Sequence, residues 1–257
     1  MNRLGAQGFT VRDLIADKRE LDAALKKIRA IGYDSIELGV PAYTTAAELK
    51  KMLDENGIMP LDVGGDVYSL LDDPSGPVED AQTLGVNYVT VSSIPNGLRG
   101  GEDGYHKFAE DMERAGELLE KEGLYLVYHN HAFEFVSFGG YNGMDILLNE
   151  TGRVKFMTDT HWIAAAGVNP PGFIRRLTGR CPMIHFKDYA IDAGTDIRES
   201  VPRLYAEVGE GNLNWPDIVR ACRETGVATI IVEQDICKVD PFTSLEISYR
   251  AMKRLGL

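Results

Sequence analysis

The feature that most constrains the fold is a regular alternation of short apolar segments with longer amphipathic ones along the whole chain. Eight segments of four to six residues are mostly apolar throughout, which predicts parallel strands covered on both faces. These predicted strands are Leu4–Gln7, Ser35–Leu38, Met59–Val63, Tyr88–Ser92, Leu124–His129, Val154–Asp159, Met183–Phe186 and Thr229–Glu233.

The segments between these strands have the periodicity of helices. Leu21, Leu25 and Ile28, for example, fall on one helical face. A glycine that could cap the helix follows many of them: Gly32, Gly57, Gly85, Gly123 and Gly226. Eight such strand–helix units in 257 residues predict an α/β fold of the (β/α)8 TIM-barrel type, with residues 1–257 as one catalytic domain. A doubly wound open sheet is the alternative, but the turn after the first strand lacks its glycine-rich phosphate fingerprint.

Composition narrows the class of partner. The chain has 27 basic and 39 acidic residues, a formal charge of −12, and no run of Lys or Arg longer than two, which argues against nucleic acid. No apolar stretch approaches the length of about 20 residues that spans a bilayer, and the first eight residues lack the apolar core of a signal peptide. Three cysteines at irregular spacing fit a reducing cytoplasm. We therefore expect a cytoplasmic protein with a small-molecule partner.

Titratable side chains collect at the ends of the last four predicted strands. Four of the five histidines lie there, with several acidic residues at the same level: His129, His131, His161, His185, Glu134, Asp159, Glu233 and Asp235. In a barrel these ends converge on one mouth, where active sites lie. Three carboxylates and one imidazole from four successive strand ends can surround one divalent ion. Mainly oxygen ligands suit Mn²⁺ or Mg²⁺, with Zn²⁺ or Co²⁺ as alternatives.

The segments that carry these residues resemble a known superfamily. They are Tyr128-His129-Asn130-His131-Ala132-Phe133-Glu134-Phe135, Thr158-Asp159-Thr160-His161-Trp162, Ile184-His185-Phe186-Lys187-Asp188 and Ile231-Val232-Glu233-Gln234-Asp235. With Val208–Trp215, they are similar to the xylose-isomerase-like TIM barrels of sugar isomerases and epimerases. That superfamily includes ketose 3-epimerases, inosose dehydratase and isomerase, and 3-keto-glycoside epimerases, and the endonuclease IV enzymes share its fold.

The resemblance implies a metal site and a set of roles. The implied ligands are Glu134, Asp159, His185 and Glu233, around one divalent ion for which Mn²⁺ is favoured. Ketose 3-epimerases place the first ligand within strand five, where this chain has His129 and His131, so a histidine of that strand is the alternative to Glu134. The Tyr-His-Asn-His segment is closer to the inosose and 3-keto-sugar enzymes.

Further roles follow for the side chains around this site. His129 or His131 is the candidate general acid or base, and the free oxygens of Glu134 and Glu233 could also face the substrate. The candidate substrate-binding residues are His161, Trp162, Lys187 and Gln234. Each of these residues also has a purely structural alternative. Asp159 could serve simply to cap a helix, Trp162 could serve simply for packing, and Lys187 and Asp188 could form a surface ion pair. Glu37 is interpreted as a residue of the rim, with a substrate contact as the alternative, and Asp188 as a turn residue.

We therefore expect a metal-dependent sugar isomerase or epimerase that removes a proton next to a carbonyl through a metal-stabilised enediolate. A lyase or dehydratase that acts on a keto-inositol or 3-keto-glycoside is the alternative. A repair endonuclease and a non-catalytic sugar-binding protein are less favoured. The expected substrate is a non-phosphorylated polyol. The long polar connection Asp188–Asn214 is either a lid or a surface insertion, and it could reach a neighbouring subunit in a homo-oligomer.

Overall fold

The structure is a computed structural model that describes residues 3–191 and 203–257. Its strands are β1 (Arg3–Gln7), β2 (Ser35–Glu37), β3 (Met59–Pro60), β4 (Val63–Gly65), β5 (Tyr88–Val91), β6 (Tyr125–His129), β7 (Lys155–Asp159), β8 (Met183–Phe186), β9 (Asp188–Ile191), β10 (Arg203–Ala206) and β11 (Thr229–Val232). All eight predicted strands are therefore present, with ends that differ from the predictions by one or two residues, and the third is divided into two pieces.

Helices connect these strands. The α-helices are α1 (Lys18–Ile31), α2 (Ala46–Glu55), α3 (Val67–Asp72), α4 (Ser75–Leu84), α5 (Glu102–Lys121), α6 (Gly143–Glu150), α7 (Thr160–Ala165), α8 (Pro170–Arg176), α9 (Trp215–Thr225) and α10 (Pro241–Arg254). Short 3-10 helices are η1 (Gly8–Leu14), η2 (Asn96–Leu98) and η3 (Phe133–Phe135). The glycines expected to end helices all have positive φ, for example +71° at Gly85 and +79° at Gly226, a conformation that favours glycine.

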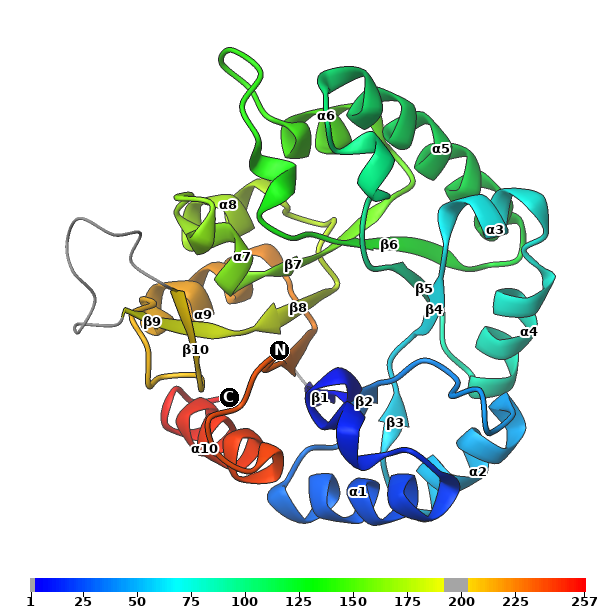
Figure 1. Cartoon of the computed structure of the whole chain (residues 1–257), viewed down its shortest axis with the longest axis vertical. Helices are drawn as coiled ribbons and strands as arrows, with labels where there is room; N and C mark the ends of the chain where they lie inside the picture. Colours follow the sequence, from blue (N-terminus) through cyan, green and yellow to red (C-terminus); the bar gives the residue numbers. More distant parts are fainter. Residues whose placement is uncertain (1–2, 192–202) are drawn as a thin grey trace.

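The parallel strands form a TIM barrel surrounded by helices (Figure 1). The strand order in the described residues is β3-β2-β1-β11-β8-β7-β6-β5-β4. The two edge strands of this sheet, β3 and β4, are successive pieces of one path separated by Leu61 and Asp62. β3 pairs with β2, and β4 pairs with β5, so the divided third strand joins the two edges. Pro60, which has no N–H to donate, ends the first piece.

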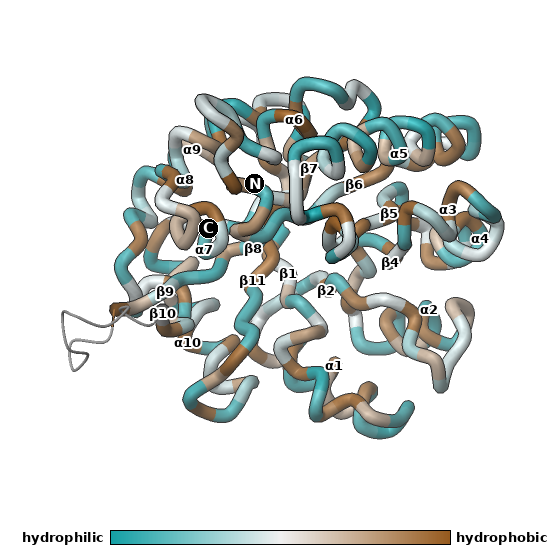
Figure 2. Tube along the Cα trace, turned by 45° about the horizontal axis from the view of Figure 1, so that its top comes forward, coloured by the Kyte–Doolittle hydropathy of each residue, from teal (hydrophilic) through white to brown (hydrophobic). Residues whose placement is uncertain are grey.

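The helices pack on the outer face of the sheet. They carry both hydrophobic and hydrophilic residues along their length (Figure 2), and the buried faces include Leu21, Leu25 and Ile28 of α1. One large apolar cluster fills the space between the helices and the sheet. No helix among the described residues is long and apolar enough to cross a membrane.

A second, smaller apolar cluster determines where the site lies. It consists of Leu61, Val127, Met157, Met183 and Ile231. Successive side chains of a strand point to opposite faces, so the residues two positions further along point into the same interior. For Val127, Met157, Met183 and Ile231, those residues are His129, Asp159, His185 and Glu233. The apolar cluster is therefore the floor beneath a layer of polar side chains at the carboxyl ends of the strands.

The connection after β8 contains a two-stranded antiparallel sheet. β9 pairs with β10, and Tyr189 is opposite Tyr205. This hairpin lies inside the long connection predicted from Asp188 to Asn214. Its middle, residues 192–202, lies outside the described residues.

Candidate functional site

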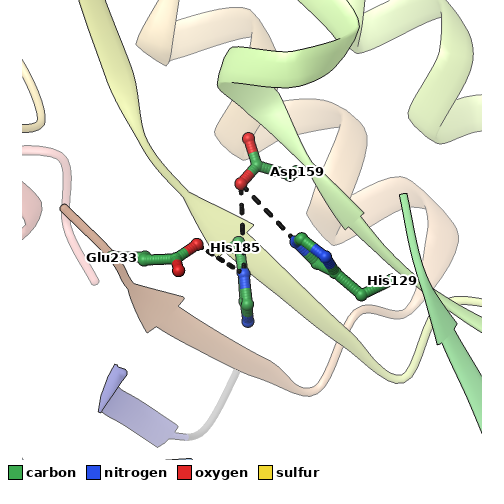
Figure 3. A group of neighbouring side chains, drawn as sticks. All are labelled: His129, Asp159, His185 and Glu233. Carbon is green, nitrogen blue, oxygen red and sulfur yellow. Dashed lines mark hydrogen bonds and ion pairs between the residues drawn. The ribbon is translucent and has the colours of Figure 1, made fainter. Parts of the chain in front are cut away.

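Four side chains from four successive barrel strands meet at one point (Figure 3). One donor atom from each of His129, Asp159, His185 and Glu233 lies within 4.8 Å of the others, and all four residues are buried. His129 Nε2 is 3.7 Å from Asp159 Oδ2, and His185 Nδ1 is 3.0 Å from Glu233 Oε2. Three of these residues, Asp159, His185 and Glu233, are ones that the sequence resemblance implies as ligands.

Glu134, implied as the first ligand, lies outside this group, and the strand-five alternative, His129, lies within it. Glu134 lies in η3, five residues beyond the end of β6, and it is fully buried. Its carboxylate accepts hydrogen bonds from the Tyr128 hydroxyl and, at 2.8 Å, from the His131 N–H. Tyr128 belongs to the outer apolar cluster, so Glu134 reaches the opposite face of β6 from His129. Burial raises the pKa of Glu134, and its role in the structure is to hold the turn that carries His131.

Lys187 lies against the same group of side chains. Its ammonium is 2.7 Å from Glu233 Oε2, 2.7 Å from Asp235 Oδ2 and 3.1 Å from Asp159 Oδ2, and only 1% of the side chain is exposed. Burial opposes the charges on Asp159 and Glu233, but the Lys187 ammonium beside them holds the pKa of both carboxyls below the ordinary value. Burial also disfavours the lysine charge, and the same carboxylates raise its pKa. Lys187 is thus the internal cation of this acidic site. The alternative, a surface ion pair of Lys187 with Asp188, is not formed among the described residues, and both side chains are buried.

Glu37, at the end of β2, holds the far side of the His185 ring. Its Oε2 is 2.5 Å from His185 Nε2, so the ring lies between Glu37 and Glu233. Burial lowers the pKa of His185, but the two carboxylates outweigh it and raise that pKa well above 6.5. Carboxylates in this position fix the orientation of a metal-binding imidazole and make it more basic. Sequence analysis assigned Glu37 to the rim, although its position at a strand end was visible.

His131 and Trp162 lie next to each other beside this group. The His131 ring lies 5.5 Å from that of Trp162 and stacks on Phe133. Three buried atoms of the predicted site residues have no hydrogen-bond partner among the described residues: His131 Nδ1, Trp162 Nε1 and Gln234 Nε2. Burial and nearby His129 lower the pKa of His131 to about 3, so its ring is uncharged at neutral pH. Buried polar atoms are normally paired, and of these three residues His131 lines a cavity at this end of the barrel, so its Nδ1 marks a place for a ligand.

His161 contacts the two-stranded sheet formed by β9 and β10. Its Nδ1 is 3.1 Å from the Asp188 carbonyl oxygen, and its ring stacks on Tyr205 of β10 at 4.8 Å. Burial lowers the pKa of His161. The expected contact of this ring with a substrate hydroxyl stays a prediction.

Asp188 is a buried hub rather than a turn residue. Its carboxylate accepts hydrogen bonds from four backbone N–H groups and one indole: Tyr189, Gly209, Gly211, Leu213 and Trp215. A Cβ at Gly211 would lie 2.4 Å from Asp188 Oδ1, which explains the glycine there. The segment before α9 is therefore fastened to the end of β8, beside the site. The local sequence around Asp188 carries no signal of these distant donors.

A cavity of about 560 Å³ opens beside the four-residue group. Its walls come from both halves of the barrel, including Gln7, Glu37, Asp62 and Thr90 on one side and His129, His131, His185 and Glu233 on the other. Arg12 is its only arginine or lysine among the described lining residues. The Arg12 guanidinium donates to the carbonyl oxygens of Phe9 and Asp235 and lies 4.1 Å above the Phe9 ring.

The donor set fits a divalent cation. Two imidazoles and two carboxylates are a combination that zinc and other first-row metal ions accept. His129 Nε2 is buried and lacks a hydrogen bond from any described residue, as expected where a cation would complete the site. The set contains one more nitrogen than the sequence implied, because His129 stands where Glu134 was expected.

Comparisons with known proteins agree with this architecture. The family model for the xylose isomerase-like TIM barrel matches residues 25–253. Inosose dehydratase from Lacticaseibacillus casei is 26% identical over 165 residues, which are 60% of this chain and 54% of that protein, so the chain spans about half the length of this relative.

Two solved structures have the same fold. A sugar phosphate isomerase/epimerase from Parabacteroides distasonis has a TM-score of 0.80 at 20% identity over 98% of this chain and 94% of its own. The IOLI protein with a bound zinc atom has a TM-score of 0.73 at 15% identity over 98% and 97% of the two chains.

Proposed function

The chain belongs to the xylose isomerase-like TIM barrel family, and from this premise we propose that it removes a proton next to the carbonyl of a small polyhydroxylated ketone. The observation that carries the proposal is the meeting of His129, Asp159, His185 and Glu233 beside a cavity at the carboxyl ends of the strands. Isomerisation or epimerisation of a sugar is the first candidate outcome of this step.

The four residues would hold one divalent cation, with Glu37 fixing His185 from behind. Zn²⁺ and Mn²⁺ both suit two nitrogens and two oxygens, and the zinc atom of the IOLI structure supports this choice of ion. A cation bound there supplies Lewis acidity, which favours negative charge on a neighbouring carbonyl oxygen.

His131 is the candidate base. It lines the cavity, and its Nδ1 has no partner among the described residues, so this nitrogen is free to accept a proton. Glu233 is the second candidate, because Lys187 and His185 keep its carboxylate ionised. Glu134 would act only by positioning His131 through the backbone N–H.

The cavity favours an uncharged polyol over a sugar phosphate. Arg12 is the one lysine or arginine among the described lining residues, and both of its terminal nitrogens already donate to carbonyl oxygens. No group of cations in this lining therefore faces a phosphate. Uncharged polar side chains of the lining, such as Gln7 and Thr90, can pair with sugar hydroxyls, which donate and accept hydrogen bonds. A volume of about 560 Å³ lies within the usual range of small-molecule sites.

Dehydration is the second candidate outcome. The match to inosose dehydratase over 60% of the chain favours it, and a keto-inositol is an uncharged polyhydroxylated ketone of the right class. Dehydration begins with the same proton removal and then expels a hydroxyl from the neighbouring carbon. The two outcomes therefore share the first step and differ in the groups that complete the reaction.

The experiment is a proton NMR survey in D₂O with a panel of keto-sugars and keto-inositols. The protein is stripped with a chelator and then reloaded with Zn²⁺ or Mn²⁺, and bound metal is measured. We expect about one ion per chain and exchange of the proton next to the carbonyl only after reloading. Exchange followed by inversion or carbonyl transfer indicates an isomerase or epimerase, and a new unsaturated product indicates a dehydratase. Full turnover by His185→Ala with no bound metal would refute the proposal.

A further inference from the structure

Asp62 lies in the interruption between β3 and β4, on the part of the barrel that does not supply the four-residue group. Its side chain is buried, with a relative exposure of 2%, and lines the cavity. The Thr90 hydroxyl of β5 donates a hydrogen bond to Asp62 Oδ2. A carboxyl group thus faces the ligand space from the wall formed by the third and fourth barrel strands.

Asp62 differs from the other carboxyl groups of the cavity in forming no ion pair with a described residue. Glu37 pairs with His185, and Glu233 and Asp235 pair with Lys187. No lysine, arginine or histidine among residues 3–191 and 203–257 forms an ion pair with Asp62. The neutral Thr90 hydroxyl is its described side-chain partner.

This arrangement makes Asp62 a carrier of a proton. A buried carboxylate without a cation is costly, and such a group keeps its proton instead. Burial and the negative charge of Glu37 raise the pKa of Asp62 well above its ordinary value, against the opposing effects of Thr90 and of His185. The charged and polar groups facing Asp62 are thus Glu37 from β2, Thr90 from β5 and His185 from β8. The cavity therefore has a carboxyl group whose protonated form is favoured on one wall, and on another the His131 ring, whose Nδ1 has no partner among the described residues.

We propose that Asp62 is the catalytic acid that gives its proton to a departing hydroxyl group, so that the reaction of this site is dehydration. The inference rests on the proposed function, because it takes the removal of the proton next to the carbonyl as the first step. Epimerisation and isomerisation need no acid for a leaving group. Elimination of hydroxide from a neutral polyol does need one, because hydroxide is a poor leaving group.

The step balances without a further reactant. The base takes the proton, and the electron pair of the C–H bond becomes the second bond between the two carbons. The bond from the neighbouring carbon to its hydroxyl breaks, and that hydroxyl leaves as water with the Asp62 proton. Asp62 is left as a carboxylate, and between turnovers it regains a proton from solvent while the base loses one.

Asp62→Asn tests this role, because it keeps the shape of the side chain and removes the transferable proton. The protein is assayed in D₂O with a keto-inositol, and exchange of the proton next to the carbonyl is measured separately from formation of the unsaturated product. Asp111→Asn is the matched control, since Asp111 is a buried aspartate of α5 that pairs with Lys107 at 2.5 Å, away from the cavity. A second substrate, with fluorine in place of the departing hydroxyl, needs no proton to leave.

We expect Asp62→Asn to slow dehydration of the keto-inositol by about 10²–10⁴-fold, the usual contribution of a general acid. Its exchange rate and its elimination of fluoride should stay within a few-fold of the unsubstituted protein, as both should in Asp111→Asn.

Other outcomes overturn the role of Asp62. An equal loss of exchange and dehydration means that Asp62 is only structural, and unchanged dehydration means that it gives no proton. Exchange without dehydration in the unsubstituted protein would leave the proposed function standing and reject the acid. If the metal-loaded unsubstituted protein neither exchanges nor dehydrates any member of the panel, both proposals fall.

Discussion

Replacing Asp188 by asparagine should destabilise the fold by about 3–6 kcal/mol, a large effect for one atom. Asp188 Oδ2 accepts from Gly209 N at 3.0 Å, Gly211 N at 3.1 Å and Trp215 Nε1 at 2.5 Å. Oδ1 accepts from Tyr189 N at 2.8 Å and Leu213 N at 3.2 Å. Whichever oxygen becomes an amide nitrogen, at least two N–H donors then face another donor. Each hydrogen bond to a charged group contributes about 1.5–3 kcal/mol, which gives the stated range for two.

Urea unfolding followed by circular dichroism measures the free energy of unfolding, and the fluorescence of Trp215 reports on the segment before α9. Asp17→Asn is the control, because Asp17 caps α1 by accepting from Glu20 N at 2.8 Å and asparagine caps a helix about as well as aspartate. We expect that variant to lie within about 0.5 kcal/mol of the unsubstituted protein. A loss below about 1 kcal/mol for Asp188→Asn would mean that the five donors are satisfied in another way, and the hub would then not be what fastens this segment.

Three further predictions concern the four-residue group. Glu37→Gln should weaken divalent-metal affinity by about 10–100-fold, because an amide holds the His185 ring less firmly than a carboxylate, and calorimetric titration of the stripped protein measures this; an unchanged affinity would contradict it. His185→Ala should abolish both stoichiometric metal binding and exchange in D₂O, and retention of one ion per chain by elemental analysis would argue against the proposed ligand set. Lys187→Met should destabilise the metal-free protein by about 3–5 kcal/mol, because it leaves Asp159, Glu233 and Asp235 without their buried cation. Added metal should raise its melting temperature more than that of the unsubstituted protein, and an equal rise in both would show that the two cations do not substitute for each other.

The barrel and much of the site could be predicted from the sequence because both depend on local patterns. Runs of apolar residues indicate the strands, and the carboxyl ends of those strands indicate the active mouth. Asp159, His185 and Glu233 were implied as ligands by the resemblance of the segments that carry them, and their side chains lie together in the structure. His129 also follows from the two-residue period of a strand, because it lies two positions after the inward-facing Val127, as Asp159 does after Met157.

The features that sequence analysis missed depend on long-range contacts. The donors that surround Asp188 lie up to 27 residues further along the chain. The pairing of Glu37 with His185 joins positions 148 residues apart. The position of Asp62 depends on the interruption of a strand that was expected to be continuous from Met59 to Val63. In each case the partner is brought by closure of the barrel, and no short motif records it.

The two sides of the cavity come from different halves of the barrel, and this division affects how substitutions can change the product of the reaction. The residues proposed to start the reaction come from the carboxyl ends of β6, β7, β8 and β11, the last four strands of the barrel. Asp62, Thr90 and Gln7, which face them across the cavity, come from the first four. Substitutions in the first half, apart from Glu37, could therefore redirect a shared reactive intermediate towards a different product without dismantling the apparatus that generates it. A laboratory search for new activities on this scaffold would best randomise that half except Glu37, which holds His185, and leave the other half intact.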